Sequence, residues 1–123
     1  MKTVFVASSR KFYDIVKNIK SNLDKLGVKA YYPYFEFGDG FIENDEEKKK
    51  QVTLKHFPEI DKIDVFYIVA KDGYVGCSVI IEMAYAYAKG KEIISSEPII
   101  ELAARALVNK VMAPEKFVNY VSK

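Results

Sequence analysis

The 123-residue chain is poor in the residues that build disulfides, metal sites and nucleic-acid interfaces. Cys77 is the single cysteine, so an intrachain disulfide and a cysteine-rich zinc site are excluded. His56 is the single histidine, which excludes a histidine-rich metal site and leaves one residue able to complete a classical catalytic triad. Arg10 and Arg105 are the only arginines and the net charge is +2, so binding of a nucleic acid polymer is disfavoured.

Long hydrophobic runs are also missing. The apolar run at 4–7 is too short for the core of a signal peptide, and the run at 79–88 contains Glu82 and falls far short of the about 20 residues that span a membrane. The length suits a single domain over residues 1–123. With one cysteine and neither of these segments, we expect a cytoplasmic protein without a membrane partner.

Short apolar runs alternate with helical patterns along the chain. Runs typical of buried strands lie at 2–7, 28–32, 64–70 and 91–95. Helices are expected at 10–26, 46–57, 77–89 and 98–108 and from 114 onward. This order predicts a three-layer α/β fold with a four- to five-stranded parallel sheet and helices on both faces.

Capping residues, glycines and prolines set the expected helix ends. The expected N-caps are Ser8 or Ser9 and Asn44 or Asp45. Gly27 and Gly90 are expected to end helices, and Pro58 to interrupt one. Two further helices are expected to start at Pro98 and Pro114. Ligands of such folds bind at the carboxyl ends of the strands, near a topological switch point. The loops at 8–11, 71–76 and 95–98 are therefore the expected site.

Glu82 is the residue that fits its surroundings least. It is the only charged residue between 74 and 88, and its neighbours on all sides of the expected helix are apolar. A buried ionised carboxylate is costly unless it is paired, so an isolated acid in such a helix is a candidate for function. Ser78 at i−4 and Tyr85 at i+3 share its face and are expected to hold the carboxylate. Alternatively, Glu82 faces solvent or forms a structural ion pair with Lys89 or Arg105.

The segment EMAYAYAKGK at 82–91, after the strand DVFYIVA and a glycine-bearing loop, resembles the nucleoside 2-deoxyribosyltransferases. It is also similar to the related 2′-deoxynucleoside 5′-monophosphate N-hydrolases. TVFVASSR at 3–10 resembles the first strand and the following Gly-Ser-x-Arg turn of those hydrolases. The likeness spans roughly residues 3 to 95. It implies a flavodoxin-like fold, a nucleoside or nucleotide substrate, no cofactor or metal, and a homodimer or larger homo-oligomer.

The resemblance also implies roles for single residues. Glu82 would be the nucleophile that attacks the anomeric carbon and expels the base, which gives a covalent deoxyribosyl-enzyme. Ser8 and Arg10 would bind the 5′-phosphate or the sugar, with help from the N-terminus of the first helix. Alternatively, the serine only caps that helix and the arginine is a solvated residue of its first turn.

Two positions depart from the family's pattern. His56 stands where the family usually carries an aspartate, eight residues before Asp64, and Gly76 stands where the transferases carry the aspartate that protonates the leaving base. Asp72, Asp61 or His56 itself is expected to substitute. Ser78 and Ile80 replace small residues near the start of the nucleophile helix, which narrows the expected pocket.

Several aromatic residues and two glycines complete the expected site. The candidates to stack on a base are Phe5, Tyr34, Phe35, Phe37 and Tyr74, and Gly38 and Gly40 are candidate hinges of a lid over 34–42. Three other functions stay open: a nucleotide-binding module without catalysis, an N-glycosidase for a dinucleotide cofactor, and an interaction protein. The last would use the helix from 114 and the ridge of Tyr85 and Tyr87 as its contact surface.

Overall fold

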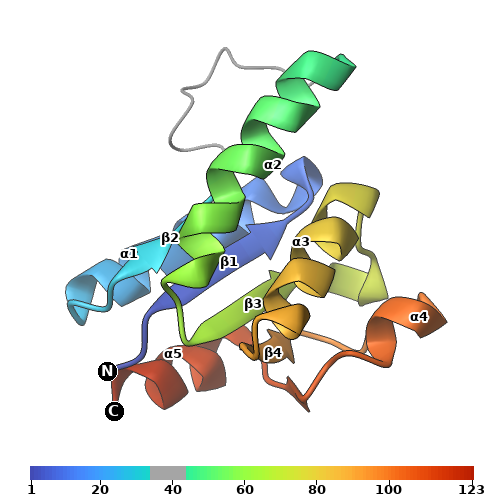
Figure 1. Cartoon of the computed structure of the whole chain (residues 1–123). Coiled ribbons are helices and arrows are strands. Elements are labelled where there is room, and N and C mark those ends of the chain that lie inside the picture. Colours follow the sequence, from blue (N-terminus) through green and yellow to red (C-terminus); the bar gives the residue numbers. More distant parts are fainter. Residues whose placement is uncertain (34–43) are drawn as a thin grey trace.

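The computed structural model describes residues 1–33 and 44–123 (Figure 1). Within them lies one five-stranded sheet in the order β2-β1-β3-β4-β5, and all its pairs are parallel. Its strands are β1 (Val4–Ser8), β2 (Ala30–Tyr31), β3 (Val65–Val69), β4 (Glu92–Ser95) and β5 (Lys110–Val111). This is the strand order of flavodoxin-like proteins, so the predicted fold class is confirmed.

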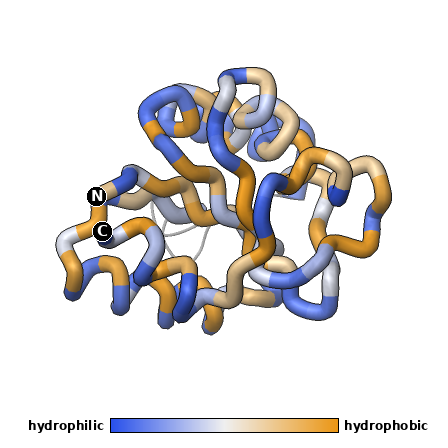
Figure 2. The backbone as a smooth tube through the Cα atoms, turned by 90° about the horizontal axis from the view of Figure 1, so that it is seen from below, coloured by the Kyte–Doolittle hydropathy of each residue, from blue (hydrophilic) through white to orange (hydrophobic). Residues whose placement is uncertain are grey.

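Helices cover both faces of the sheet. They are η1 (Arg10–Phe12), α1 (Tyr13–Lys25), α2 (Glu46–Asp61), η2 (Lys71–Gly73), α3 (Cys77–Ala88), α4 (Leu102–Arg105) and α5 (Pro114–Ser122). The core under α1 and α5 is separate from the core under α2, α3 and α4. Figure 2 shows hydrophobic residues along the central strands and hydrophilic residues on the outer turns of the helices.

The central strands β1 and β3 are buried at every position, because helices cover both faces of the sheet. Val4 and Val6 face α1 and α5, whereas Phe5 and Ala7 face α2 and α3, and all four are fully buried. An aromatic stack joins the sheet to one of its covering helices. Tyr67 of β3 stacks on Phe117 of α5 with ring centroids 3.7 Å apart.

Several predicted helix ends are confirmed, and one cap is wrong. Gly27 and Gly90 follow helices at φ of +72° and +76°, a left-handed conformation that favours glycine. The Asp45 side chain accepts a hydrogen bond from the Lys48 amide at 2.9 Å and caps α2. Ser9 stands before η1 but makes no side-chain cap, because the chain first forms a 3₁₀ turn and α1 begins only at Tyr13.

Pro58 and Pro98 act differently from the prediction, whereas Pro114 opens α5 as predicted. Helix α2 continues through Pro58 to Asp61, because Pro58 and Leu54 lie on the exposed side, where water can reach the carbonyl that loses its amide partner. Pro98 does not open a helix. Ile99 is fully buried and the Ile100 amide donates to the Gly73 carbonyl at 3.0 Å, which holds this segment non-helical until α4. Strand β5 was not predicted, since it has two exposed residues and no apolar pattern.

Tyr120 of α5 ties the end of the chain to the sheet. Its hydroxyl donates to Glu92 at 2.7 Å and accepts from the Lys110 ammonium at 3.1 Å, and Lys110 also pairs with Glu92 at 3.0 Å. Burial alone would raise the pKa of Glu92, but the hydrogen bonds from Tyr120 and Lys110 and the lysine charge outweigh it and lower that pKa. The carboxylate form is therefore the one that the fold stabilises.

We expect Tyr120→Phe to reduce the free energy of unfolding by about 1 kcal/mol at neutral pH. Because the folded-state pKa of Glu92 is lowered, its contribution is present above the unfolded-state pKa and is lost as pH falls through the folded-state pKa. The difference between variant and wild type should shrink in acid, which urea denaturation at about pH 7 and about pH 3 would measure. Tyr87→Phe is the matched control, because the Tyr87 ring is half-exposed and the same substitution there should leave the free energy of unfolding nearly unchanged. An equal loss at both pH values would contradict the role of the Glu92 charge.

Candidate functional site

The carboxyl ends of β1 and β3 form the switch point of the sheet, since β2 lies beyond β1 and β4 lies beyond β3. Ser8 ends β1 and pairs with Val69 at the end of β3. The turns η1 and η2 follow these strands and carry Arg10 and Asp72. The sequence-predicted loops at 8–11 and 71–76 therefore lie at one edge of the sheet, and α3 starts beside them.

Glu82 lies in the second turn of α3 and is 6% exposed. Its Oε2 contacts Nδ1 of His56, which lies in α2 and is 1% exposed. The two alternatives for Glu82 are wrong, because it is buried and its partner is a histidine. Lys89 pairs instead with Asp61, at 3.8 Å. The structure thus brings together the candidate nucleophile and the residue that replaces the family's aspartate.

His56 is held from the sheet side by Phe5. The two ring centroids are 5.1 Å apart at an interplanar angle of 71°, and Phe5 stacks on Phe66 at 5.4 Å and 3°. Phe5 is fully buried in this position. The prediction that Phe5 stacks on a substrate base is therefore wrong, since both of its neighbours are protein rings.

Ser78 and Tyr85 do not hold Glu82 from its two sides as predicted. The Ser78 hydroxyl accepts a hydrogen bond from the Lys49 ammonium at 3.1 Å. The Tyr85 hydroxyl donates to Asp61 at 2.7 Å, and its ring stacks on Phe57 at 4.2 Å. The hydrogen bond to Asp61 is the main cause that raises the pKa of Tyr85.

These contacts form a polar stripe between the parallel helices α2 and α3, in the order Lys49–Ser78, His56–Glu82 and Asp61–Tyr85. The first contact lies at the start of α3, next to the switch point, and the last lies near the end of α3. Asp61 also accepts a hydrogen bond from Lys91 through its carbonyl, at 3.0 Å. Asp61 therefore lies away from the switch point and replaces neither of the two family aspartates that this chain lacks, whereas His56 and Asp72 stay candidates.

The two loops of the switch point meet through Tyr74. The Lys11 ammonium lies 3.4 Å from the centroid of the Tyr74 ring, and Phe12 meets the same ring edge-on at 6.1 Å. Tyr74 is 42% exposed, so one of its surfaces is available for stacking. Arg10 is exposed beside this contact, and the Ser8 hydroxyl donates to the Ser9 carbonyl at 3.1 Å. Sequence analysis missed Lys11 and Lys49, because nothing in the chain distinguishes them from its other lysines.

Five aromatic and glycine candidates are not placed by this structure. Tyr34, Phe35, Phe37, Gly38 and Gly40 lie outside the described residues. Among residues 1–33 and 44–123, no group of three or more histidine, cysteine or acidic side chains is arranged to hold a metal ion. No helix within the same ranges is both long and apolar enough to cross a membrane.

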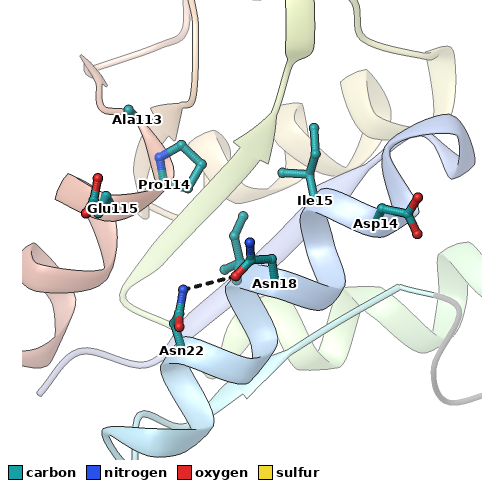
Figure 3. Close-up of a pocket in the computed structure, with 8 residues that line it drawn as sticks. Asp14, Ile15, Asn18, Asn22, Ala113, Pro114 and Glu115 are labelled. Carbon is teal, nitrogen blue, oxygen red and sulfur yellow. Dashed lines mark hydrogen bonds between the residues drawn. The ribbon is translucent and has the colours of Figure 1, made fainter.

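A separate groove lies on the opposite face of the sheet, between α1 and the start of α5 (Figure 3). Its volume is about 570 Å³. It is lined by Asp14, Ile15, Asn18, Ile19, Asn22, Ala113, Pro114 and Glu115. Within it Asn22 donates to Asn18 at 3.3 Å. No sequence-predicted site residue lines this groove, so it is not part of the candidate site.

No protein-family model matches the chain, and no curated protein sequence matches it. Solved structures with a similar fold include a conserved protein from Enterococcus faecalis V583, with TM-score 0.73 and 14% identity over 98% of this chain and 97% of that one. A 2-deoxyribosyltransferase from Bacillus psychrosaccharolyticus has TM-score 0.72 and 20% identity, over 96% and 91%. The CMP N-glycosidase BcmB from Clostridium botulinum has TM-score 0.57 and 18% identity, over 97% and 96%. The fold implied by the family resemblance is thus confirmed.

Proposed function

We propose that the protein cleaves or transfers the N-glycosidic bond of 2′-deoxynucleosides or their 5′-monophosphates, with Glu82 as nucleophile. The observation that carries the proposal is the burial of Glu82 in an otherwise uncharged helix, in contact with His56, below the switch point of the sheet. The names of two proteins with this fold, a 2-deoxyribosyltransferase and a CMP N-glycosidase, support this class of chemistry.

The reaction would proceed by two displacements at the anomeric carbon. A Glu82 carboxylate oxygen forms a bond to C1′ while the bond from C1′ to the base nitrogen breaks, and the base leaves with the electron pair and takes up a proton. Water or a second base then attacks C1′ and gives its proton to the group that protonated the leaving base, and Glu82 departs as a carboxylate. The transition states resemble an oxocarbenium ion, which a fixed carboxylate in a water-poor site stabilises. Asp72 is our candidate to donate the proton to the leaving base.

Cationic groups at the switch point support a phosphorylated substrate. Arg10 and Lys11 lie in the turn that follows β1, and Lys71 lies in the turn that follows β3. Guanidinium and ammonium groups stabilise a phosphate dianion strongly. Tyr74 lies against Lys11 and supplies an exposed ring for the base or the sugar.

If Arg10 binds the 5′-phosphate, Arg10→Ala should raise KM for deoxynucleoside 5′-monophosphates by about 10- to 100-fold. KM for the unphosphorylated deoxynucleosides should stay unchanged, because they lack the group that the arginine binds. Steady-state kinetics with each pair of substrates gives both values. Arg105→Ala is the matched control, since Arg105 is exposed in α4 and is the only other arginine of the chain. Equal increases for both substrate types would contradict phosphate binding by Arg10.

The proposal is tested by chromatographic detection of free base from deoxynucleosides, their 5′-monophosphates, ribonucleotides and a nicotinamide dinucleotide, each with and without an acceptor base. Release from a deoxy substrate is expected, and a new nucleoside would identify transfer. If none of these substrates releases a free base, the proposal is overturned.

The proposed enzyme is a cytoplasmic homo-oligomer. The free, exposed thiol of Cys77 suits a reducing compartment. The half-exposed Ile81 and Tyr87 on α3 and the more exposed Ile100 and Leu102 near α4 are apolar surface that a second subunit would cover. Sedimentation equilibrium of the assayed protein is expected to give a dimer or larger species, and a monomer at all concentrations would remove this part of the proposal.

A nucleotide-binding module without catalysis is the second candidate. Its specific support is His56, which occupies the position of a family aspartate and engages the Glu82 carboxylate. This candidate predicts saturable binding of nucleotides without product in the same assays.

A further inference from the structure

We propose that His56 is a positioning residue for Glu82, a role that rests on the proposed function. Its Nδ1–H donates to Oε2 of Glu82 and fixes the plane of the carboxylate, so that Oε1 is the oxygen that attacks the sugar. The contact between Nδ1 and Oε2 and the burial of both side chains carry this proposal. The role differs from that of a carboxylate at this position, because a histidine nitrogen can donate a hydrogen bond to Glu82 whereas an ionised aspartate cannot.

The burial of Glu82 creates the need for such a donor. A carboxylate with 6% exposure has lost most of its contact with water, so its oxygens need hydrogen-bond donors within the protein. An imidazole N–H supplies such a donor, and the same hydrogen bond selects the tautomer with its proton on Nδ1.

The position of the imidazole is fixed by packing. Phe5 meets the ring at 71° from the sheet side, and Phe5 is in turn stacked on Phe66. On the helix layer, the Lys49–Ser78 hydrogen bond precedes the His56–Glu82 contact and the Phe57–Tyr85 stack follows it. These neighbours fix the alignment of α2 on α3. A donor held in this way restricts the carboxylate to one orientation.

The same hydrogen bond serves both displacements. When Oε1 bonds to C1′, Glu82 becomes an ester and Oε2 becomes its carbonyl oxygen, which still accepts from Nδ1–H. When water or a second base attacks C1′ and gives its proton to Asp72, the C1′–Oε1 bond breaks and its electron pair restores the carboxylate. No proton leaves His56 in either step, so the histidine acts through Glu82 and not on the substrate.

Because His56 is the only histidine, [¹⁵N]histidine labelling reports on this ring alone. NMR of the substrate-free wild type is expected to show a protonated Nδ1 whose signal shifts in Glu82→Gln. An unprotonated Nδ1, or a signal that is the same in both proteins, would overturn the proposal. This measurement needs no substrate, so it tests the hydrogen bond between His56 and Glu82 separately from the proposed function. Inactivity of the wild type would overturn the proposed function, and the positioning role with it, even if the NMR signals were as expected.

Kinetics of three variants then separate positioning from packing. In His56→Asn the amide nitrogen can take the place of Nδ1 and donate to Glu82, whereas His56→Leu keeps bulk without a donor and His56→Gln moves the donor outward. We expect His56→Leu and His56→Gln to lower kcat on the order of 100-fold with little change in KM, and His56→Asn to stay within about 10-fold of wild type. Folding of each variant is checked by circular dichroism.

A folded His56→Leu with wild-type kcat would overturn the role, as would equal losses in the asparagine and glutamine variants. If His56→Leu fails to fold, the comparison of kcat between His56→Asn and His56→Gln still tests the positioning role. Both side chains are polar, and they differ in the place of the N–H group that donates to Glu82.

Discussion

Glu82→Gln should lower base release by at least about 1,000-fold, if Glu82 is the nucleophile. The amide oxygen of glutamine can still accept a hydrogen bond from His56, so the packing of α2 on α3 is kept. The amide cannot form the bond to C1′ at a useful rate and brings no negative charge to the transition state. Free base measured by chromatography at saturating substrate gives the loss in kcat.

Glu115→Gln supplies the matched control, because Glu115 lies on α5, on the opposite face of the sheet. It should retain wild-type kcat. Mass spectrometry of the wild type, quenched during turnover, should show a deoxyribosyl adduct on the peptide that contains Glu82, and the adduct should be absent from Glu82→Gln. A fully active Glu82→Gln protein would remove Glu82 from the mechanism, whatever its fold.

Gly73→Ala should reduce the free energy of unfolding by about 3 kcal/mol, which lowers Tm by roughly 12 °C for a domain of this size. Gly73 has φ of +80°, which disfavours any side chain. A Cβ placed there would also lie 2.6 Å from Cγ1 of Ile100 and 2.8 Å from the Pro98 carbonyl oxygen. The carbonyl belongs to a backbone that is tied to Gly73 by a hydrogen bond, so it cannot easily move away.

Gly90→Ala separates the two causes. Gly90 has a similar φ of +76°, but nothing lies within 4 Å of a Cβ built there. This variant should lose about 1 kcal/mol, or roughly 4 °C, from backbone strain alone. Thermal unfolding of both variants measures the difference. Equal losses would mean that the loop after β3 yields to the added methyl group, and that its contact with the segment before α4 is loose.

The fold was predictable because its main signals are local. Val65–Val69 is apolar throughout, as expected of a strand covered on both faces, and Gly27 and Gly90 end their helices where the pattern places them. The failures came where tertiary contacts decide. Ile99 is drawn into the core, which removes the helix expected from Pro98, and β5 is too short and too polar to leave a pattern.

The candidate site was predictable only in part, for a related reason. Glu82 stood out because a single charge in an apolar helix is visible in one segment. Its partner His56 stands out in the sequence as the single histidine and as a departure from a family pattern, but its contact with Glu82 depends on how α2 packs on α3. The Tyr85 hydroxyl was assigned to Glu82 from helical spacing, yet it points to Asp61 of the neighbouring helix. Spacing gives the face of a helix but not the element that faces it.

The first and last residues of the fold lie side by side (Figure 1), where the Lys2 amide donates to the Val121 carbonyl at 2.9 Å. This junction is at the amino end of β1, whereas the switch point is at its carboxyl end. A tag, a fused partner or a surface linker attached at either end would therefore share one anchoring point, and the edge of the sheet with the candidate site would be directed away from it. Immobilisation through the ends gives the molecules a common orientation without obstructing the entry of small molecules.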